Sequence, residues 1–389
     1  MGKFYNSTIL FMEIICLLKL MVLVLFLGAI GLFFLSEKHK PAFTVLVVFV
    51  NVALTSVPAV LAFMGQAQTG MLAMPHFLGN FVVRVDSLSA WFILIINFTV
   101  LTGIVFGTEF LKHFSHLKTN LNIHWFSFLL FHSAMIWVCM FENGIAFIIA
   151  WELMLVSSLL LAMFEFQKKE KLKAGLNYLI QMHISVVFIM LGFVWLYVKT
   201  GSFNFSALAS LPVSDQSLWI FVLFFIGFAF KAGFVPLHTW LPGADAAAPS
   251  HIAGIMSGVL VKLGIYGIFR IAINLQQDWV LLGELLITIS IITAIYGIGN
   301  AAVKMNLNRM LAYCTIENIG IIGIGIGLGL IGLGTGNSLM VLLGFGSALL
   351  HTLNHSLFKS LLFFVSGTVF LKTQTFNIEK LGGLLKKMP

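Results

Sequence analysis

Three ionisable residues lie inside long apolar stretches of the sequence. Glu152 occurs in AWELMLVSS, Lys231 in FAFKAGFVPLH and Lys262 in SGVLVKLGIYG. A charge at the centre of a bilayer costs from about 3 to well over 10 kcal/mol, so such residues are candidates for function. Burial raises the pKa of a carboxyl group and lowers that of a lysine, which brings both toward neutral pH. The three residues therefore predict proton transfer inside an apolar phase.

A second set of candidates lies on one later segment. His351, His355 and Lys359 follow at spacing i, i+4, i+8 in LLHTLNHSLFKSLLFF, so a helix would carry all three on one face. Histidine changes charge near neutral pH, which extends the predicted proton relay. Glu317, in YCTIENIG, is a further candidate from the preceding apolar segment. The alternative is that these side chains are hydrogen-bond anchors between helices, and the sequence leaves it open.

Other histidines and glutamates occur singly in or near apolar segments. Isolated residues of this kind are more often packing, interfacial or helix-end groups than parts of a site. We therefore expect a structural role for His124, His132, His183, His238, Glu109 and Glu284.

Gly233 and Pro236 follow Lys231 directly and predict a break in its helix. Proline removes a backbone hydrogen bond and clashes with the preceding turn. Broken helices at membrane depth typically line a cavity or an ion site, because the freed carbonyl groups need partners. A simple proline kink is the alternative.

The elements that position these residues are indicated by composition. Of 389 residues, 60% are hydrophobic and 9% are charged, against about 25% charged in ordinary globular chains. This predicts an all-α, polytopic membrane protein. Although the formal net charge is +8, no polar domain presents basic residues with exposed aromatics, which argues against nucleic-acid binding. Single cysteines without a ligand pattern predict no metal, disulfide or redox cofactor, and the Gly-rich stretch GIGIGLGLIGLGTG is better explained by helix packing than by a dinucleotide site.

Apolar runs between polar or Pro/Gly breaks predict about eleven transmembrane helices. Their predicted ranges are 14–36, 43–65, 88–112, 122–141, 144–164, 176–199, 217–241, 249–272, 279–303, 309–333 and 339–371.

The connecting loops predict an orientation, because cytoplasmic loops carry the excess of Lys and Arg. Alternate loops divide these residues unequally, and the poorer side holds Lys3, Arg84, Lys199 and Arg270. This places the N-terminus outside the cell and the C-terminus in the cytoplasm. We expect the membrane to be the cell membrane of a bacterium or archaeon. The final segment LGGLLKKMP reads as the approach to another helix, so we expect the chain to be truncated.

The stretch KAGFVPLHTWLPGADAAAPSHIAGIMSGVLVKLGIYGIFR, with WELM before it and HTLNHSLFKSLLFFVSGTVF after it, resembles a known family. It is similar to the antiporter-like proton-translocating subunits of respiratory complex I and of Mrp-type cation antiporters. NRMLAYCTIENIGIIGIGIGLGL and NIEKLGGLLKKMP resemble the hydrogenase-4 and formate hydrogenlyase branch. The resemblance covers roughly residues 85–389.

The resemblance implies a fourteen-helix core with two inverted five-helix repeats, each with one broken helix. Three regions follow from it: helices 1–3 in 1–121, the first repeat in 122–273, and an incomplete second repeat in 279–389. By position, Glu152, Lys231 and Lys262 match the family's relay residues in the first repeat, and His351 and His355 match its central histidines. The relay residue of the second broken helix would lie beyond residue 389.

One motif departs from the resemblance. In LPGAD, relatives usually carry an acidic residue at Gly243 and a histidine at Asp245. We expect this change to alter the cytoplasmic mouth of the first half-channel.

These features favour a non-catalytic, ion-translocating subunit of an oxidoreductase complex of the NADH-quinone oxidoreductase or hydrogenase type. Its partners would be other membrane subunits that carry the redox chemistry. It would move protons across the lipid bilayer, and the sequence leaves Na⁺ open as the alternative ion. A subunit of an Mrp-type Na⁺/H⁺ antiporter is the alternative. A structural subunit that conducts nothing is a third possibility.

The relay makes three geometric predictions. Glu152 and Lys231 should lie within reach of one another, directly or through one water. Lys262, His351 and His355 should face a common polar seam rather than lipid. Because the second repeat is incomplete, His351, His355 and Lys359 should line an open groove.

Overall fold

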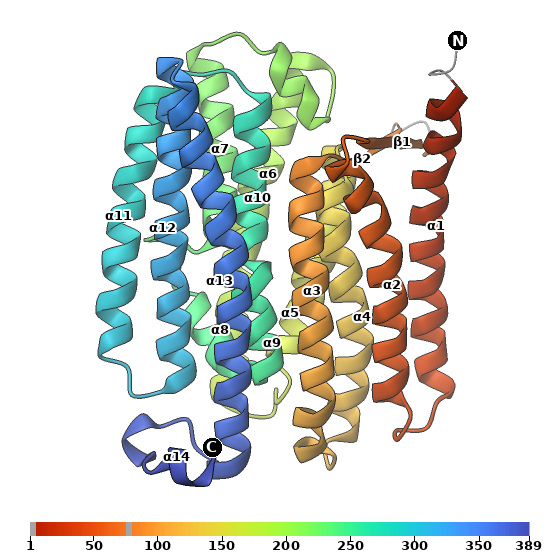
Figure 1. Ribbon diagram of the computed structural model, residues 1–389, viewed down its shortest axis with the longest axis vertical. Helices are drawn as coiled ribbons and strands as arrows, with labels where there is room; N and C mark the ends of the chain where they lie inside the picture. Colours follow the sequence, from red (N-terminus) through yellow and green to blue (C-terminus); the bar gives the residue numbers. More distant parts are fainter. Residues whose placement is uncertain (1–4, 75–79, 389) are drawn as a thin grey trace.

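The computed structural model describes residues 5–74 and 80–388. Within these ranges, 11 helices are long and apolar enough to cross a membrane, as the sequence predicts. The start of α1 and the short helix α14 lie at opposite ends of the bundle (Figure 1). Lys3, one of the residues on which the predicted orientation rests, lies outside the described residues.

The N-terminal region contains three helices and a hairpin that the sequence analysis missed. Its elements are α1 (Tyr5–Phe34), α2 (Lys40–Phe63), β1 (Gln68–Leu72), β2 (Phe81–Val85), α3 (Ser87–Phe110) and the 3-10 turn η1 (Leu111–Phe114). The strands are antiparallel, with Gln68 opposite Val85. Asp86 then caps α3 by accepting a hydrogen bond of 2.9 Å from the backbone N–H of Ser89.

The next region contains α4 (Lys118–Met140), α5 (Gly144–Ala162), α6 (Lys169–Thr200), the 3-10 turn η2 (Phe205–Ser210) and α7 (Asp215–Ala232). Asn143 caps α5 by accepting from two backbone N–H groups. α6 begins at Lys169 rather than at residue 176. The sequence analysis placed this start too late because it required apolar residues, whereas the first turns of α6 are rich in lysine.

The break predicted at Gly233 and Pro236 is present. The helix predicted over 217–241 ends at Ala232, and Gly233 closes it with a φ of 88°. This left-handed conformation suits glycine, which has no Cβ. The chain resumes as the short helix α8 (Leu241–Ala247).

The eighth predicted span is built from three consecutive segments. These are α9 (Ser250–Ile255), the π-helical turn η3 (Met256–Leu260) and α10 (Lys262–Asn274). Its membrane-length window is entirely buried inside the bundle. A π turn widens the backbone locally and is frequent at functional sites.

The C-terminal region contains α11 (Trp279–Ala302), α12 (Leu307–Thr335), α13 (Ser338–Thr373), the 3-10 turn η4 (Ile378–Lys380) and α14 (Leu384–Lys387). Glycines let α11 and α12 approach closely: a Cβ added at Gly297 would lie 2.4 Å from the backbone nitrogen of Glu317. Close helix packing therefore accounts for this glycine.

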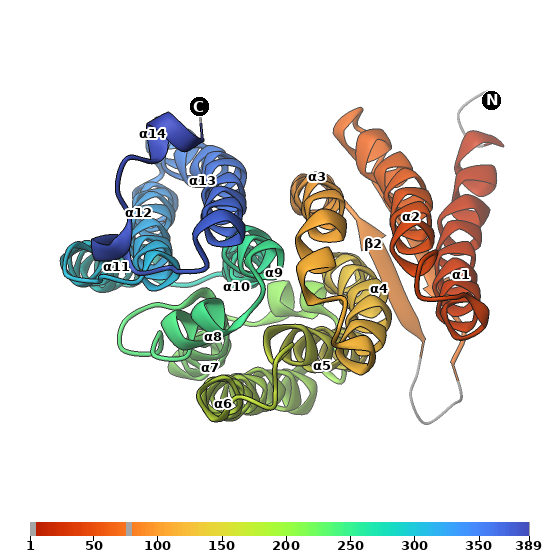
Figure 2. The ribbon, with the colours of Figure 1, turned by 90° about the horizontal axis from the view of Figure 1, so that it is seen from below.

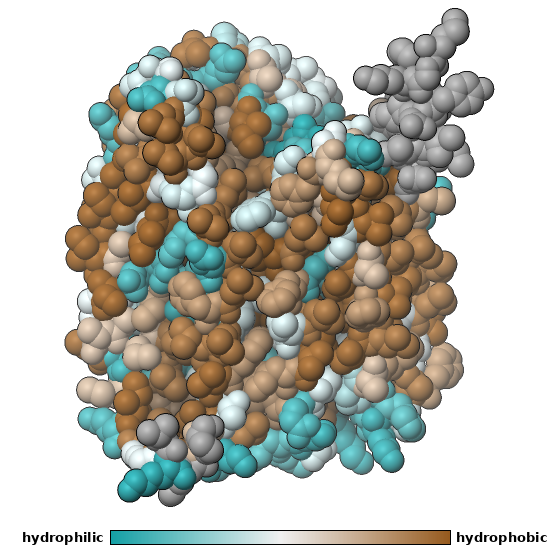
Figure 3. Space-filling model, in the orientation of Figure 1, coloured by the Kyte–Doolittle hydropathy of each residue, from teal (hydrophilic) through white to brown (hydrophobic). Residues whose placement is uncertain are grey.

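Two sets of helices flank the central span. Seen from below, α1–α4 lie on one side of α9 and α10, and α11–α13 lie on the other (Figure 2). α13 packs against α3, α9 and η3, which joins the two sides. The surface has a broad hydrophobic band with hydrophilic residues gathered at the ends, as a bilayer requires (Figure 3).

Candidate functional site

Lys231 occupies the last turn of α7, next to the helix break. It is fully buried, and its Nζ donates to the hydroxyl oxygen of Tyr178, 3.3 Å away. The same nitrogen lies 5.8 Å from the ring centre of Trp151. The Tyr178 oxygen is also 2.6 Å from the hydroxyl of Ser158. The buried ammonium group of Lys231 is therefore surrounded by aromatic rings and bonds to a neutral hydroxyl group.

Glu152 follows Trp151 on α5, but it does not form an ion pair with Lys231 among the described residues. Its side chain is 31% exposed, and its Oε2 lies 3.8 Å from Nε2 of His183, an exposed residue on α6. Glu152 remains within electrostatic range of Lys231. The predicted contact between Glu152 and Lys231, directly or through one water, therefore stays a prediction, because Lys231 bonds Tyr178 and Glu152 lies beside His183.

A polar cluster surrounds the π turn. The hydroxyl of Ser257 donates to Asp245 on α8 and lies 3.1 Å from the hydroxyl of Thr315 on α12. Lys262 donates to the backbone carbonyl of Ser257. Asp245, Ser257 and Lys262 are each at most 1% exposed. Asp245 of LPGAD is therefore a buried member of this cluster, and its effect on the cytoplasmic mouth stays a prediction.

Lys359 and two serines bring α13 onto this cluster. Lys359 is 1% exposed and donates to the carbonyl of Leu311 over 3.1 Å. Ser356 and Ser360 donate to the carbonyls of Gly258 and Gly254, on η3 and α9, at 2.6 and 3.2 Å. Lys262 lies within electrostatic range of both Lys359 and Asp245. Residues far apart in the sequence therefore meet at one place.

The two central histidines differ in their surroundings. His351 is half-buried, and its Nε2 lies 2.9 Å from the side-chain oxygen of Asn318. His355 is fully buried, and neither ring nitrogen has a hydrogen-bond partner in the described part of the chain. It lies within electrostatic range of Lys262 and Lys359. We call Asp245, Ser257, Lys262, His351, His355 and Lys359 the central seam.

The expectation of an open groove is wrong for two of its three residues. His355 and Lys359 are buried because α13 packs directly on α9 and η3. A hydrophilic patch does interrupt the apolar band over α12 and α13 (Figure 3). On α13, His351 is half-buried and Asn354 is exposed.

Glu317 remains a prediction. It is half-buried on α12 and lies within electrostatic range of Lys359. Its backbone packs against Gly297. The residue is thus close to the central seam without a hydrogen bond that joins it to the seam.

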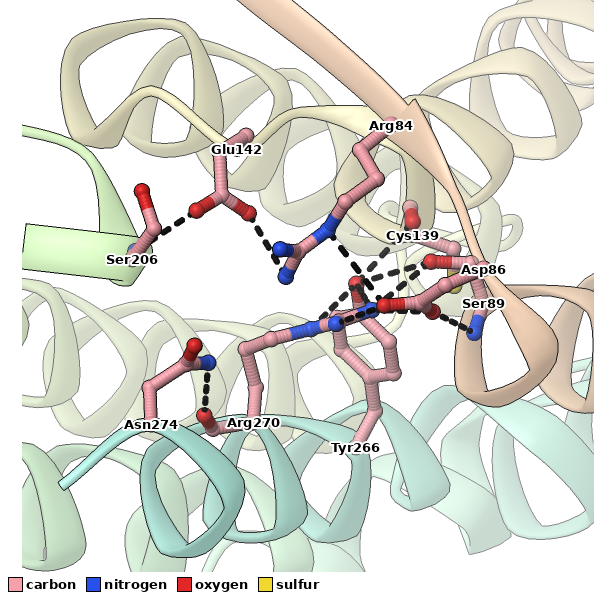
Figure 4. A network of polar contacts seen from close by, with 9 residues as sticks. All are labelled: Arg84, Asp86, Ser89, Cys139, Glu142, Ser206, Tyr266, Arg270 and Asn274. Atoms are coloured by element: carbon pink, nitrogen blue, oxygen red, sulfur yellow. Dashed lines mark hydrogen bonds and ion pairs between the residues drawn. The ribbon is translucent and has the colours of Figure 1, made fainter. Parts of the chain in front are cut away.

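A second buried ionic cluster lies at the end of the bundle that carries the hairpin (Figure 4). Arg270 of α10 donates to both carboxylate oxygens of Asp86, at 2.5 and 3.0 Å, and to the hydroxyl of Ser89 at 2.8 Å. Its guanidinium also donates to the oxygen of Tyr266, 2.9 Å away. This arrangement ties α10 to the start of α3.

The cluster continues through a second arginine. Arg84 contacts Asp86 at 3.3 Å and Glu142 at 2.8 Å, and Glu142 accepts from the backbone N–H of Ser206. We call Arg84, Asp86, Glu142 and Arg270 the hairpin-end network. Burial alone would raise the pKa of Asp86, but the hydrogen bonds and charge of Arg270 hold that pKa well below its usual value.

Sequence reasoning missed several of these residues. It counted Arg270 as a loop charge, whereas Arg270 lies in α10 and is 2% exposed. An arginine flanked by Ile and Phe was the available signal for burial. No pattern in the sequence identified Tyr178 as the partner of Lys231. In the described residues, no group of three or more His, Cys, Asp or Glu side chains is placed to hold a metal ion.

Residues 142–389 match the family described as NADH:quinone oxidoreductase/Mrp antiporter, transmembrane. The chain belongs to this family. Because the match spans α5 to α13, it includes every residue of the predicted relay.

Named relatives refine this placement. The chain is 33% identical over 332 residues to hydrogenase-4 component B of Escherichia coli K12, which covers 84% of this chain and 48% of the relative. It is 41% identical over 182 residues to formate hydrogenlyase subunit 3 of the same strain, covering 46% and 29%. It is 31% identical over 316 residues to NAD(P)H-quinone oxidoreductase chain 4 1 of Synechococcus elongatus, covering 80% and 55%. The chain thus spans about half the length of the first and third of these relatives.

Two solved structures share the fold. One is the membrane-bound sulfane sulfur reductase, an archaeal respiratory membrane complex, with a TM-score of 0.82 and 23% identity over 96% of this chain and 74% of the other. The other is the Mrp complex from Dietzia sp. DQ12-45-1b, with a TM-score of 0.75 and 17% identity over 94% and 65%. The protein is an antiporter-like, multi-pass membrane subunit similar to subunits of hydrogenase and NADH-quinone oxidoreductase complexes.

Proposed function

We propose that this chain is the proton-translocating membrane subunit of a membrane-bound hydrogenase or complex I-like redox complex. The observation that carries the proposal is the central seam. It buries two lysines, a carboxylate and a histidine between three helical regions, although each such group is costly in an apolar phase. Purely structural anchoring would be served by neutral groups such as Ser356 and Ser360.

The proposed path runs from Glu152 through Lys231 and Lys262 to His355, His351 and Lys359. Glu152 is half-buried and supplies an accessible start, and the helix break leaves Lys231 next to an irregular backbone that can move. Tyr178 is an added positioning residue for Lys231. Glu317 would contribute by its charge near Lys359.

The partners we propose are other membrane subunits that carry the redox chemistry, and the support is that similar proteins include a hydrogenase-4 component, a formate hydrogenlyase subunit and a subunit of a respiratory membrane complex. Its location would be the cell membrane of a bacterium or archaeon, with the N-terminus outside. The inverted repeats proposed over 122–273 and 279–389 would meet where α13 packs against α9 and η3.

A subunit of an Mrp-type Na⁺/H⁺ antiporter is the second candidate. The observation in its favour is the fold, since 94% of this chain superimposes on a subunit of an Mrp complex. Dependence on Na⁺ distinguishes the two candidates.

The test is proton uptake by inverted membrane vesicles that contain the chain in its own assembly, energised in turn with H₂, formate and NADH. We expect Glu152→Gln to reduce uptake by about tenfold or more, because the carboxylate can no longer exchange a proton or stabilise the charge of Lys231. Glu109→Gln, at an exposed helix-end residue of the same type, is the matched control. Unchanged uptake with Glu152→Gln would reject the role of this residue, and uptake driven only by a Na⁺ gradient would favour the antiporter.

A further inference from the structure

His124 on α4 and His251 on α9 form a buried pair outside the central seam. Their Nε2 atoms are 3.1 Å apart, and the side chains are 1% and 0% exposed. One ring must donate and the other accept, so the two rings hold different tautomers. The Nδ1 atom of each ring is buried without a hydrogen-bond partner in the described part of the chain.

Both histidine rings are tightly packed among aromatic side chains. Aromatic rings surround His124, with the ring centre of Phe164 at 5.6 Å and that of Trp125 at 5.2 Å. Phe110 lies 5.9 Å from His251. On α3, a Cβ added at Gly107 would lie 2.6 Å from the His251 ring, so only glycine leaves room for it. No described hydrogen bond or ion pair links an acidic residue to either ring.

A third buried histidine shows what a structural role looks like on the same helix. His132, also on α4, has its Nε2 3.1 Å from Asn97 and its Nδ1 3.4 Å from Asn51. Both of its nitrogens are thus engaged. His124 lies two turns earlier, and its Nδ1 has no hydrogen-bond partner in the described part of the chain. A histidine that only anchors helices would have both nitrogens hydrogen-bonded, as His132 does.

The pair lies between a hollow and the central seam. A hollow of about 670 Å³ opens beside Lys38, Lys112 and Lys118 and extends to Trp125, the neighbour of His124. On the other side, His251 precedes Ser257 by six residues in one helical segment, a rise of roughly 9 Å at 1.5 Å per residue. Ser257 donates to Asp245 of the seam.

We propose that His124 and His251 form a proton inlet that leads from the lysine-rich end of α2, α3 and α4 to the central seam. A proton binds Nδ1 of His124, and that ring gives its Nε2 proton to Nε2 of His251. His251 then releases its Nδ1 proton toward Ser257 and Asp245. The pair holds the same number of protons before and after, but each ring is left in the other tautomer. A second transfer through the turned rings, in which Nδ1 and Nε2 exchange roles, restores the starting tautomers. The inlet deepens the proposed function and rests on it.

The test compares variants in the vesicle assay, with uptake expressed per folded chain. His124→Phe and His251→Phe suit the aromatic surroundings and should each reduce uptake by about tenfold or more, with no further loss in the double variant. His132→Gln is the matched control and should retain uptake. Lys262→Met serves as the marker of the seam.

The outcomes separate the two proposals. Full uptake in both phenylalanine variants, with uptake lost in Lys262→Met, would overturn the inlet and leave the proposed function standing. Full uptake in all variants, Lys262→Met included, would overturn both. An equal loss in His132→Gln would also overturn the inlet, because the effect would then follow any buried histidine.

A measurement on the unaltered chain covers the case in which the variants do not fold. ¹⁵N-histidine spectra of the protein in bilayers should show an Nε2–H···Nε2 pair whose proton exchanges with D₂O, while the hydrogen-bonded signals of His132 exchange more slowly. If the shared hydrogen of the pair is not replaced by deuterium during prolonged exposure to D₂O, the inlet is contradicted.

Discussion

The hairpin-end network and the central seam bury ionisable groups in opposite ways. In the network, Arg84 and Arg270 meet Asp86 and Glu142, so two positive charges face two negative ones within hydrogen-bond distance. In the seam, Lys262 and Lys359 donate to backbone carbonyls, and Asp245 accepts from a serine. In the network, each charged group contacts a group of opposite charge. In the seam, Lys262, Lys359 and Asp245 bond to neutral groups instead.

This difference shows how each region can serve the protein. Paired charges with several hydrogen bonds hold one arrangement, because removing either partner strands the other. Lysines held by neutral groups can lose a proton without breaking an ion pair. The network thus fixes the end of α10, and Lys262 lies at the other end of that same helix.

Breaking the network should produce the largest loss of stability. Arg270→Met would leave Asp86 without its main partner and should lower the free energy of unfolding by about 3 kcal/mol. A thermal melt of the protein in detergent measures this loss. Lys199→Met, at an exposed residue near the same end of the bundle, is the control and should leave the melt unchanged. A melt of Arg270→Met equal to that of the control would show that the network is not a clamp.

A smaller effect should follow from pH. Because Arg270 depresses the pKa of Asp86, the stability that this carboxylate contributes is present above its unfolded pKa of about 3.9 and is lost as the pH falls toward the folded value. The melting temperature should therefore fall more steeply below about pH 4 in the unaltered chain than in Asp86→Asn. Parallel curves for the two proteins would refute the assignment.

The sequence was sufficient for the parts of the site that depend on hydrophobicity. Lys231 and Lys262 interrupt apolar runs, so both their burial and their location inside membrane-length helices followed from composition. The break at Gly233 followed equally from local chemistry. These features need only one segment of chain at a time.

What the sequence could not provide depends on contacts between distant segments. Asp245 reads as a loop residue, and only the packing of α8 against α9 and α12 makes it a buried partner of Ser257. His124 and His251 are 127 residues apart, and each alone resembles a packing histidine. The hairpin was missed because its strands are short and follow a long run of helical residues.

A small change in stability and a large change in transport should come together from one substitution, Lys262→Met. Methionine fills a similar volume and removes a buried charge, so the free energy of unfolding should change by less than about 1 kcal/mol. Proton uptake per folded complex in energised vesicles is the direct measurement, with Lys304→Met, outside the seam, as the matched control. The account predicts a loss of about tenfold or more for Lys262→Met and full uptake for Lys304→Met. Full uptake by a stable Lys262→Met protein would contradict the claim that the central seam carries protons.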